Sequence, residues 1–147
     1  MLVPGKIIFT AFLLLYILAA NAQSAERDSL INIINITRND TIKVLNFARL
    51  SRLYLYEKPV TGISYSIQGL DLARKLKHKR GVAICLNEMG NCYRMTGNYT
   101  KALALHFEAL KIAEELKDNE TLANSYHGIS AVHEDQGYYN DAIKYAH

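Results

Sequence analysis

The chain of 147 residues contains no tryptophan, only two prolines and only two cysteines. Cys85 and Cys92 are seven residues apart in a stretch predicted to be helical, which corresponds to about 10 Å of helix rise. That distance is too long for a disulfide within one helix. Two thiols without a third or fourth ligand also do not match a zinc site. We therefore expect both cysteines to be small residues of the core.

The chain also has little excess charge of either sign. The 17 lysines and arginines against 14 acidic residues leave a net charge of +3, too small to indicate a nucleic-acid surface. Charged residues make up 21% of the chain and alternate with apolar ones, and 50% of the residues are hydrophobic. This composition favours one folded domain over a disordered chain.

Common enzyme motifs are absent as well. The sequence has no Gly-x-Ser-x-Gly, no phosphate-binding glycine loop and no His-Glu-x-x-His. His127 and His133 are six residues apart, on different faces of a predicted helix, which favours packing over metal binding. We expect no catalytic residue, cofactor or metal site within these residues.

Residues 1–22 have the pattern of a secretory signal peptide. Lys6 is their only charge, residues 7–20 are apolar, and Ala20-Asn21-Ala22 fits the small-x-small cleavage rule. The apolar run is short for a membrane span, and no cysteine follows it as in a bacterial lipoprotein. We predict an exported, periplasmic or otherwise extracytoplasmic chain whose mature domain does not insert into the membrane. An uncleaved anchor and a helix of the folded domain are the alternatives.

The stretch from Gly81 to Leu116 predicts a helical hairpin. Apolar residues recur at helical spacing, Gly97-Asn98 interrupts them, and the pattern restarts at Tyr99. The positions that carry this pattern are Leu86, Met89, Gly90 and Tyr93, then Ala102, Leu105, Ala109, Leu110, Ile112, Ala113 and Leu116.

The same spacing recurs about 40 residues earlier and later, which predicts repeats over residues 41–79, 80–119 and 120–147. In the first repeat Pro59 replaces the Gly-Asn turn. Residues 23–40 precede the repeats, and we expect a short helix within them to cover the first repeat; a flexible leader is the alternative. The third repeat stops within its second helix, so we expect a truncated chain with further parts downstream.

The residue order of this hairpin resembles the tetratricopeptide repeat (TPR), with a large apolar residue, Gly and Tyr in the first helix and two alanines in the second. The resemblance implies an all-α fold, a right-handed α-solenoid of antiparallel helix hairpins that binds proteins or peptides. A period of about 40 residues, longer than the usual value of about 34, resembles repeats of exported bacterial proteins.

Such repeats often form the sensing half of histidine kinases or of membrane-bound transcription regulators. The resemblance therefore implies an extracytoplasmic sensing region of a larger signalling protein, with a membrane anchor expected downstream. The alternatives are a stand-alone periplasmic assembly scaffold and the N-terminal part of an enzyme whose catalytic domain lies downstream.

In such a solenoid the first helix of each hairpin lines a concave groove. Positions between the core residues point into it, and their amide and guanidinium groups hydrogen-bond peptide backbones and carboxylates. We predict a partner-binding groove formed by Arg52, Asn87, Asn91, Arg94, His127 and Glu134, with ordinary hydrated polar residues as the alternative. The remaining positions of the first and third repeats that correspond to Asn87, Asn91 and Arg94 are Ala48, Leu55 and Ala131. Ala48, Arg52 and Gly128 depart from the carboxylate clamp of chaperone-binding TPR proteins, so we do not expect that activity.

The run from Arg74 to Arg80 contains the densest positive charge of the chain. At the C-terminus of a predicted helix, cations complement the helix dipole. A docking patch for an acidic partner is the alternative, and we expect no nucleic-acid binding.

The signal-peptide pattern predicts cleavage between Ala22 and Gln23. N-terminal sequencing of the exported protein should therefore give Gln23 as the first residue. A mature chain that begins at Met1 would overturn both the cleavage and the periplasmic location.

Overall fold

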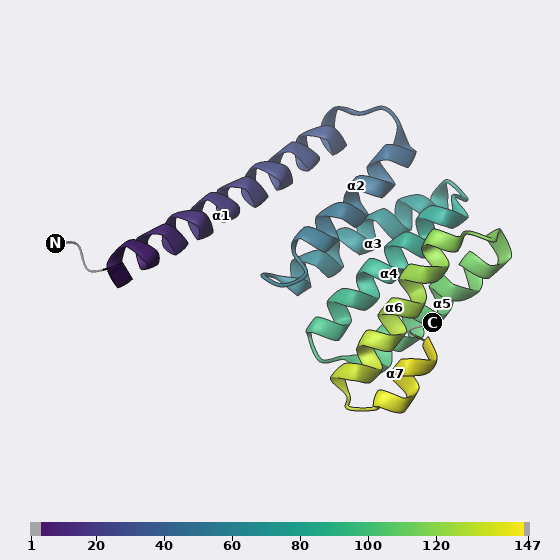
Figure 1. Ribbon diagram of the computed structural model, residues 1–147. Coiled ribbons are helices and arrows are strands. Elements are labelled where there is room, and N and C mark those ends of the chain that lie inside the picture. Colours follow the sequence, from purple (N-terminus) through teal and green to yellow (C-terminus); the bar gives the residue numbers. More distant parts are fainter. Residues whose placement is uncertain (1–3, 146–147) are drawn as a thin grey trace.

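The computed structural model of the chain describes the backbone of residues 4–145 and, within that range, all side chains except those of residues 4–8, 10–12 and 16–20. These residues form seven α-helices and no strand (Figure 1). The helices are α1 (Pro4–Ile36), α2 (Asp40–Leu53), α3 (Pro59–Lys75), α4 (Lys79–Met95), α5 (Tyr99–Leu116), α6 (Asn119–Asp135) and α7 (Tyr139–Tyr145).

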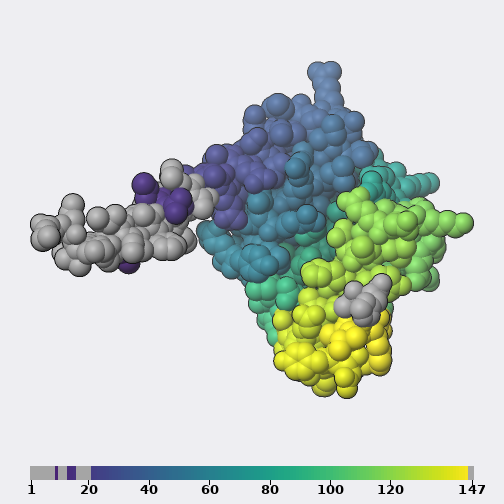
Figure 2. All heavy atoms as spheres, in the orientation of Figure 1, coloured from purple at the N-terminus to yellow at the C-terminus, as the bar shows by residue number. Residues whose placement is uncertain are grey.

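The helices after α1 form two layers of antiparallel hairpins. Each helix contacts the next one along the chain, and α4 also contacts both α2 and α6. The second helices α3, α5 and α7 make no such contacts with one another within the described residues. Figure 2 shows the hairpins stacked in sequence order, from α2 in blue to α7 in yellow. The expected all-α solenoid of helix hairpins is confirmed, with α2, α4 and α6 side by side in one layer.

The turns within the second and third hairpins depend on glycine. Gly97 and Gly137 have φ angles of +77° and +78°, in the left-handed region that a side chain disfavours. After Gly97, the side-chain oxygen of Asn98 accepts a hydrogen bond from the backbone N–H of Lys101 at 3.2 Å and caps α5. In the first hairpin Pro59 begins α3, a position where its missing N–H leaves no helix bond unmade.

Helix α1 is longer than the short helix expected within residues 23–40. It runs without a break from Pro4 to Ile36, because the sequence has neither glycine nor proline between Gly5 and Ile36. The helix is interrupted at residues 37–39, and Asn39 caps α2 by accepting a hydrogen bond from the N–H of Ile42 at 3.1 Å. Cleavage within this helix stays a prediction.

The C-terminal part of α1 lies against α2, whereas its N-terminal part extends away from the repeats (Figure 1). Arg27 Nη2 donates a hydrogen bond to the Leu53 carbonyl oxygen at 3.0 Å, and the Arg27 guanidinium lies 4.3 Å from the ring centroid of Tyr54. Leu30 is buried. Within the part of the chain that the structure describes, no helix combines the length and the apolar character needed to cross a bilayer.

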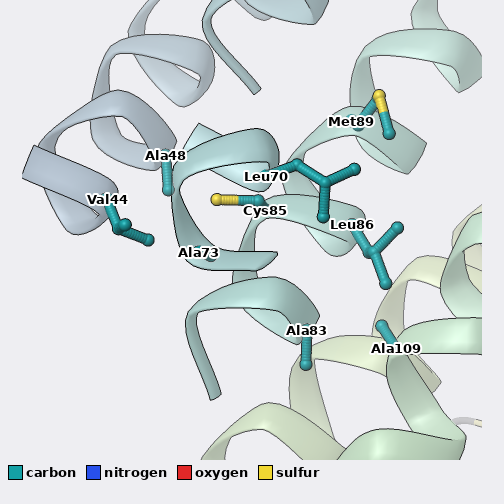
Figure 3. Packing of buried hydrophobic residues seen from close by; sticks show 9 residues of the cluster. All are labelled: Val44, Ala48, Leu70, Ala73, Ala83, Cys85, Leu86, Met89 and Ala109. Atoms are coloured by element: carbon teal, nitrogen blue, oxygen red, sulfur yellow. The ribbon is translucent and has the colours of Figure 1, made fainter. Parts of the chain in front are cut away.

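The core is built from small and medium-sized apolar side chains of α2 to α5 (Figure 3). Cys85 and Cys92 are both free and buried, as expected, and burial raises the pKa of the Cys85 thiol to about 12. A Cβ at Gly69 would lie 2.8 Å from Cys85 Sγ, and one at Gly62 would lie 2.7 Å from Cys92 Sγ. The two glycines of α3 therefore make room for the two sulfur atoms of α4.

Ala102, at the start of α5, is fully buried, and the matching Gly62 and Ala142 are buried as well. We predict that Ala102→Leu lowers the free energy of unfolding by about 1–3 kcal/mol, because the larger side chain has no free volume at this helix crossing. Chemical denaturation measures the change. Ala104→Leu is the matched control, since Ala104 lies exposed on the same helix and should change stability by less than about 0.5 kcal/mol. Equal effects of the two substitutions would contradict the packing.

Candidate partner-binding groove

A groove of about 330 Å³ crosses the layer formed by α2, α4 and α6. It runs diagonally, from the C-terminal end of α2 over the middle of α4 to the N-terminal half of α6. The residues that line it are Arg52, Leu55, Tyr56, Ile84, Asn87, Glu88, Asn91, Thr121, Asn124 and His127.

Helical spacing explains why these side chains share one surface. Ile84, Asn87 and Asn91 follow one another at three and four residues on α4, and Thr121, Asn124 and His127 follow at three residues on α6. Residues at these spacings are neighbours on one face of a helix. Because α4 and α6 pack side by side, the two rows form adjacent walls of the groove.

Arg52 and Glu88 form an ion pair across α2 and α4. Arg52 Nε donates to Glu88 Oε1 at 3.0 Å, and Nη2 donates to the same oxygen. The Glu88 side chain is only 4% exposed, whereas that of Arg52 is 64% exposed. The hydrogen bond and the charge of Glu88 raise the pKa of Arg52. The second oxygen, Glu88 Oε2, is buried without a hydrogen-bond partner among the described residues.

Asn87 forms the floor of the groove and is almost fully buried. Its Nδ2 donates to Ser125 Oγ at 2.9 Å, and its Oδ1 lies 2.9 Å from His106 Nδ1. Because an amide oxygen only accepts, His106 Nδ1 carries the proton and donates it. Asn87 lines the groove at the predicted position, but both ends of its amide are already engaged in holding neighbouring helices together.

His106, on α5, is fully buried between α4 and α6. A Cβ at Gly90 would lie 2.8 Å from His106 Nε2, and a Cβ at Gly128 would overlap the same ring. The two glycines therefore create the space that the imidazole fills. Burial, followed by the charges of Arg94 and His127, lowers the pKa of His106 to about 4. Sequence reasoning missed this site; glycine at two helix-interior positions, where it costs propensity, was its signal.

The structure brings four of the six predicted groove residues together and leaves two outside. Arg52, Asn87, Asn91 and His127 line the groove. Arg94 Nη1 instead donates to Asp135 at 2.7 Å, and its side chain is only 16% exposed.

Glu134 also lies outside the groove, and it accepts a hydrogen bond from Ser130 Oγ at 3.1 Å. Arg94 and Glu134 occupy the last turns of α4 and α6, which the diagonal groove does not reach. Ala48 is buried in the core instead of facing the groove. Leu55 does line the groove. The lining residues that sequence reasoning missed are Tyr56, Ile84, Glu88, Thr121 and Asn124.

The basic run extends from the end of α3 to the start of α4 and pairs with acidic residues of α5, of the following turn and of the start of α6. Arg80 contacts Asp118 at 2.7 Å and Glu120 at 2.6 Å. Arg74 pairs with Glu108, and Lys79 pairs with Glu115. These contacts favour a structural role for the run. Across the described residues, no cluster of three His, Cys, Asp or Glu side chains could hold a metal ion.

The buried His106 predicts that stability depends on pH. Its folded pKa of about 4 lies below the ordinary value of 6.5, so the unfolded chain binds more protons below neutrality. The contribution is complete above about pH 7 and is lost as the pH falls through 6.5 toward 4. We expect a loss of about 2 kcal/mol between pH 7.5 and pH 5, measured by denaturant unfolding.

His106→Gln should remove this part of the pH dependence, whereas His127→Gln, at an exposed position, should retain it. An NMR titration of the folded protein provides an independent check. A His106 ring that becomes protonated near pH 6.5 would contradict the predicted shift.

Comparison with known proteins agrees with this architecture. A sequence profile described as Tetratricopeptide repeat matches residues 57–115 and 82–146, more than half of the chain. None of the curated proteins compared with the chain matches it. The crystal structure of the TPR domain of Arabidopsis FLU is similar, with a TM-score of 0.64 and 18% identity over 73% of this chain and 91% of that one. At this identity the similarity concerns the fold alone. The stacked hairpins and the profile match together show that the chain belongs to the tetratricopeptide repeat family.

Proposed function

We propose that the groove binds an extended segment of a partner protein. TPR domains bind proteins or peptides and are generally non-catalytic scaffolds. The observation that carries the proposal is the pair of amides of Asn91 and Asn124, which line the groove from neighbouring helices. Neither side chain hydrogen-bonds another described residue. An amide that offers both donors and an acceptor matches the alternating groups of a peptide backbone.

The α2 end of the groove supplies apolar contact area. Leu55, which is mostly buried, and the exposed Tyr56 lie just after α2, and Ile84 of α4 lines the groove with them. Tyr56 is 79% exposed. Tyrosine is enriched at protein interfaces, because its ring offers a large contact area at a low cost in conformational entropy. An extended segment could therefore place an apolar side chain at this end while its backbone meets the two amides.

For the whole protein, we propose the extracytoplasmic sensing region of a larger bacterial signalling protein, a histidine kinase or a membrane-bound transcription regulator. The signal-peptide pattern of residues 1–22 and the repeat period of about 40 residues support it. The gene sequence after the codon for His147 tests it. A membrane span and a kinase or DNA-binding domain would support the proposal. A stop codon would favour a stand-alone periplasmic scaffold, and a hydrolase or cyclase domain would favour an enzyme.

The groove hypothesis predicts the effect of removing both amides. We expect Asn91→Ala combined with Asn124→Ala to weaken partner binding roughly 10- to 100-fold, because each lost hydrogen bond costs about 0.5–1.5 kcal/mol. Quantitative pull-down from the native compartment measures the binding. Circular dichroism and the melting temperature of the same samples should be nearly unchanged, since neither amide supports the fold.

Lys75→Glu combined with Lys77→Glu is the control. Both lysines are exposed near the turn between α3 and α4 and form no ion pair with a described residue. Partner binding should survive this charge reversal. Binding that survives the loss of both amides and disappears with the charge reversal would place the binding site at the basic edge instead.

A further inference from the structure

We propose that Arg52 selects the partner, and that the selected group is the carboxylate of an aspartate or glutamate side chain in an extended peptide. This inference rests on the proposed function of the groove and names the chemistry of its ligand. It depends on three features: the exposure of the two charges, the unused donors of the guanidinium, and the apolar residues beside it.

The exposed charge of the groove is positive. Arg52 and Glu88 cancel in a formal count, but the carboxylate is almost fully buried while the guanidinium is 64% exposed. The other polar groups that line the groove and reach its surface are uncharged or aromatic: the hydroxyl of Tyr56, the amides of Asn91 and Asn124 and the imidazole of His127. The charge of Glu120 also acts on Arg52, but Glu120 is paired with Arg80. A ligand at the groove therefore meets one cation whose own ion-pair partner lies behind it, which favours an anionic group.

Arg52 can bind a second carboxylate without releasing the first. A guanidinium has five N–H groups, and Glu88 Oε1 accepts hydrogen bonds from Nε and Nη2. Both N–H groups of Nη1 and the second one of Nη2 have no partner among the described residues. Parallel N–H groups of this kind match the two oxygens of a carboxylate. Glu88 is then a positioning residue, because it holds the guanidinium at the groove and reduces the entropy lost on binding.

The neighbours of Arg52 add a sequence preference. Leu55 and Tyr56 line the same end of the groove, so an apolar ligand side chain would lie next to the bound carboxylate. In an extended peptide, residues two positions apart point to the same side. The favoured ligand therefore carries an acidic residue and, two positions away, an apolar or aromatic one.

A cationic ligand is the rival, because Glu88 Oε2 is buried without a hydrogen-bond partner among the described residues. Glu88 is already paired with Arg52, however, and a lysine side chain would have to displace that guanidinium to reach the carboxylate. Such a ligand would replace the ion pair between Arg52 and Glu88 by another ion pair with Glu88, so the number of ion pairs would not increase. The geometry therefore favours the acidic ligand, and the cationic one becomes an outcome of the test.

The test uses three capped peptides that differ at one position. Each is an alternating Ser and Leu peptide with a central Glu-Ser-Leu, Gln-Ser-Leu or Lys-Ser-Leu segment. Binding to the 147-residue chain is followed by amide NMR shifts and fluorescence anisotropy. We expect the Glu peptide to bind about tenfold more tightly than the Gln peptide, the Lys peptide to bind most weakly, and the preference to shrink as salt is added.

Arg52→Gln combined with Glu88→Gln removes the positive charge of the guanidinium and, at the same time, the buried carboxylate that would otherwise be left unpaired. We expect this variant to bind the Glu and Gln peptides equally. Arg52→Lys keeps the charge but loses the planar donors, so the preference should fall to between onefold and tenfold. Arg74→Gln, at an exposed residue outside the groove, should leave the preference unchanged.

Each other outcome overturns the inference. Equal binding of all three peptides, with shifts at groove residues, would reject the selection by Arg52 but leave the groove as a peptide site. Preference for the Lys peptide would make Glu88 the selecting group. If no peptide binds while partner capture still depends on Asn91 and Asn124, the acidic ligand is wrong and the proposed function stands; if both fail, the proposed function fails as well.

Discussion

The insertion of one imidazole between two glycines is the contact on which the groove depends. His106 of α5 occupies the space that Gly90 and Gly128 leave open on α4 and α6. Its donated hydrogen bond fixes Asn87, which in turn donates to Ser125. This chain of hydrogen-bonded polar groups joins α5, α4 and α6 at the floor of the groove, while His106 Nε2 is buried without a partner among the described residues. Polar groups buried in this way are stabilising only while every partner is present.

Ion pairs between hairpins act together with this packing. Arg52–Glu88 and Arg94–Asp135 each include one poorly exposed side chain, and so does Arg80–Asp118. Both partners are exposed in Arg74–Glu108 and Lys79–Glu115. Exposed ion pairs contribute about 0–1 kcal/mol, so Arg74–Glu108 and Lys79–Glu115 add little to the free energy of unfolding. Loss of one partner of a buried pair costs more, because a charge remains without compensation. The ion pairs Arg52–Glu88 and Arg94–Asp135 therefore constrain the relative positions of α2, α4 and α6, the first helices of the three hairpins.

The groups available for binding are those that the fold leaves unused. Asn87 and Arg94 hydrogen-bond neighbouring residues of the chain, whereas the amides of Asn91 and Asn124 and the outer edge of Arg52 are the groups that we propose for binding. A scaffold protein needs both kinds of polar residue, one kind to fix the repeats and another to meet the partner. The two kinds of residue have the same side-chain chemistry and differ only in the residues that surround them. This explains why a family resemblance predicts the groove better than it predicts the individual contacts.

The sequence by itself determined the helices, their hairpin turns and most of the core. Gly97-Asn98 and Pro59 act through local backbone preferences, and the apolar spacing around Leu86 and Met89 reports which helix face is buried. The tertiary structure alone decided the site. The groove runs diagonally across α2, α4 and α6, so Arg94 and Glu134 lie outside it while Glu88 and Asn124 line it. It also buries Asn87 against His106. Such contacts join residues about 20 to 40 positions apart, and helical periodicity holds no information on which residues of separate helices meet.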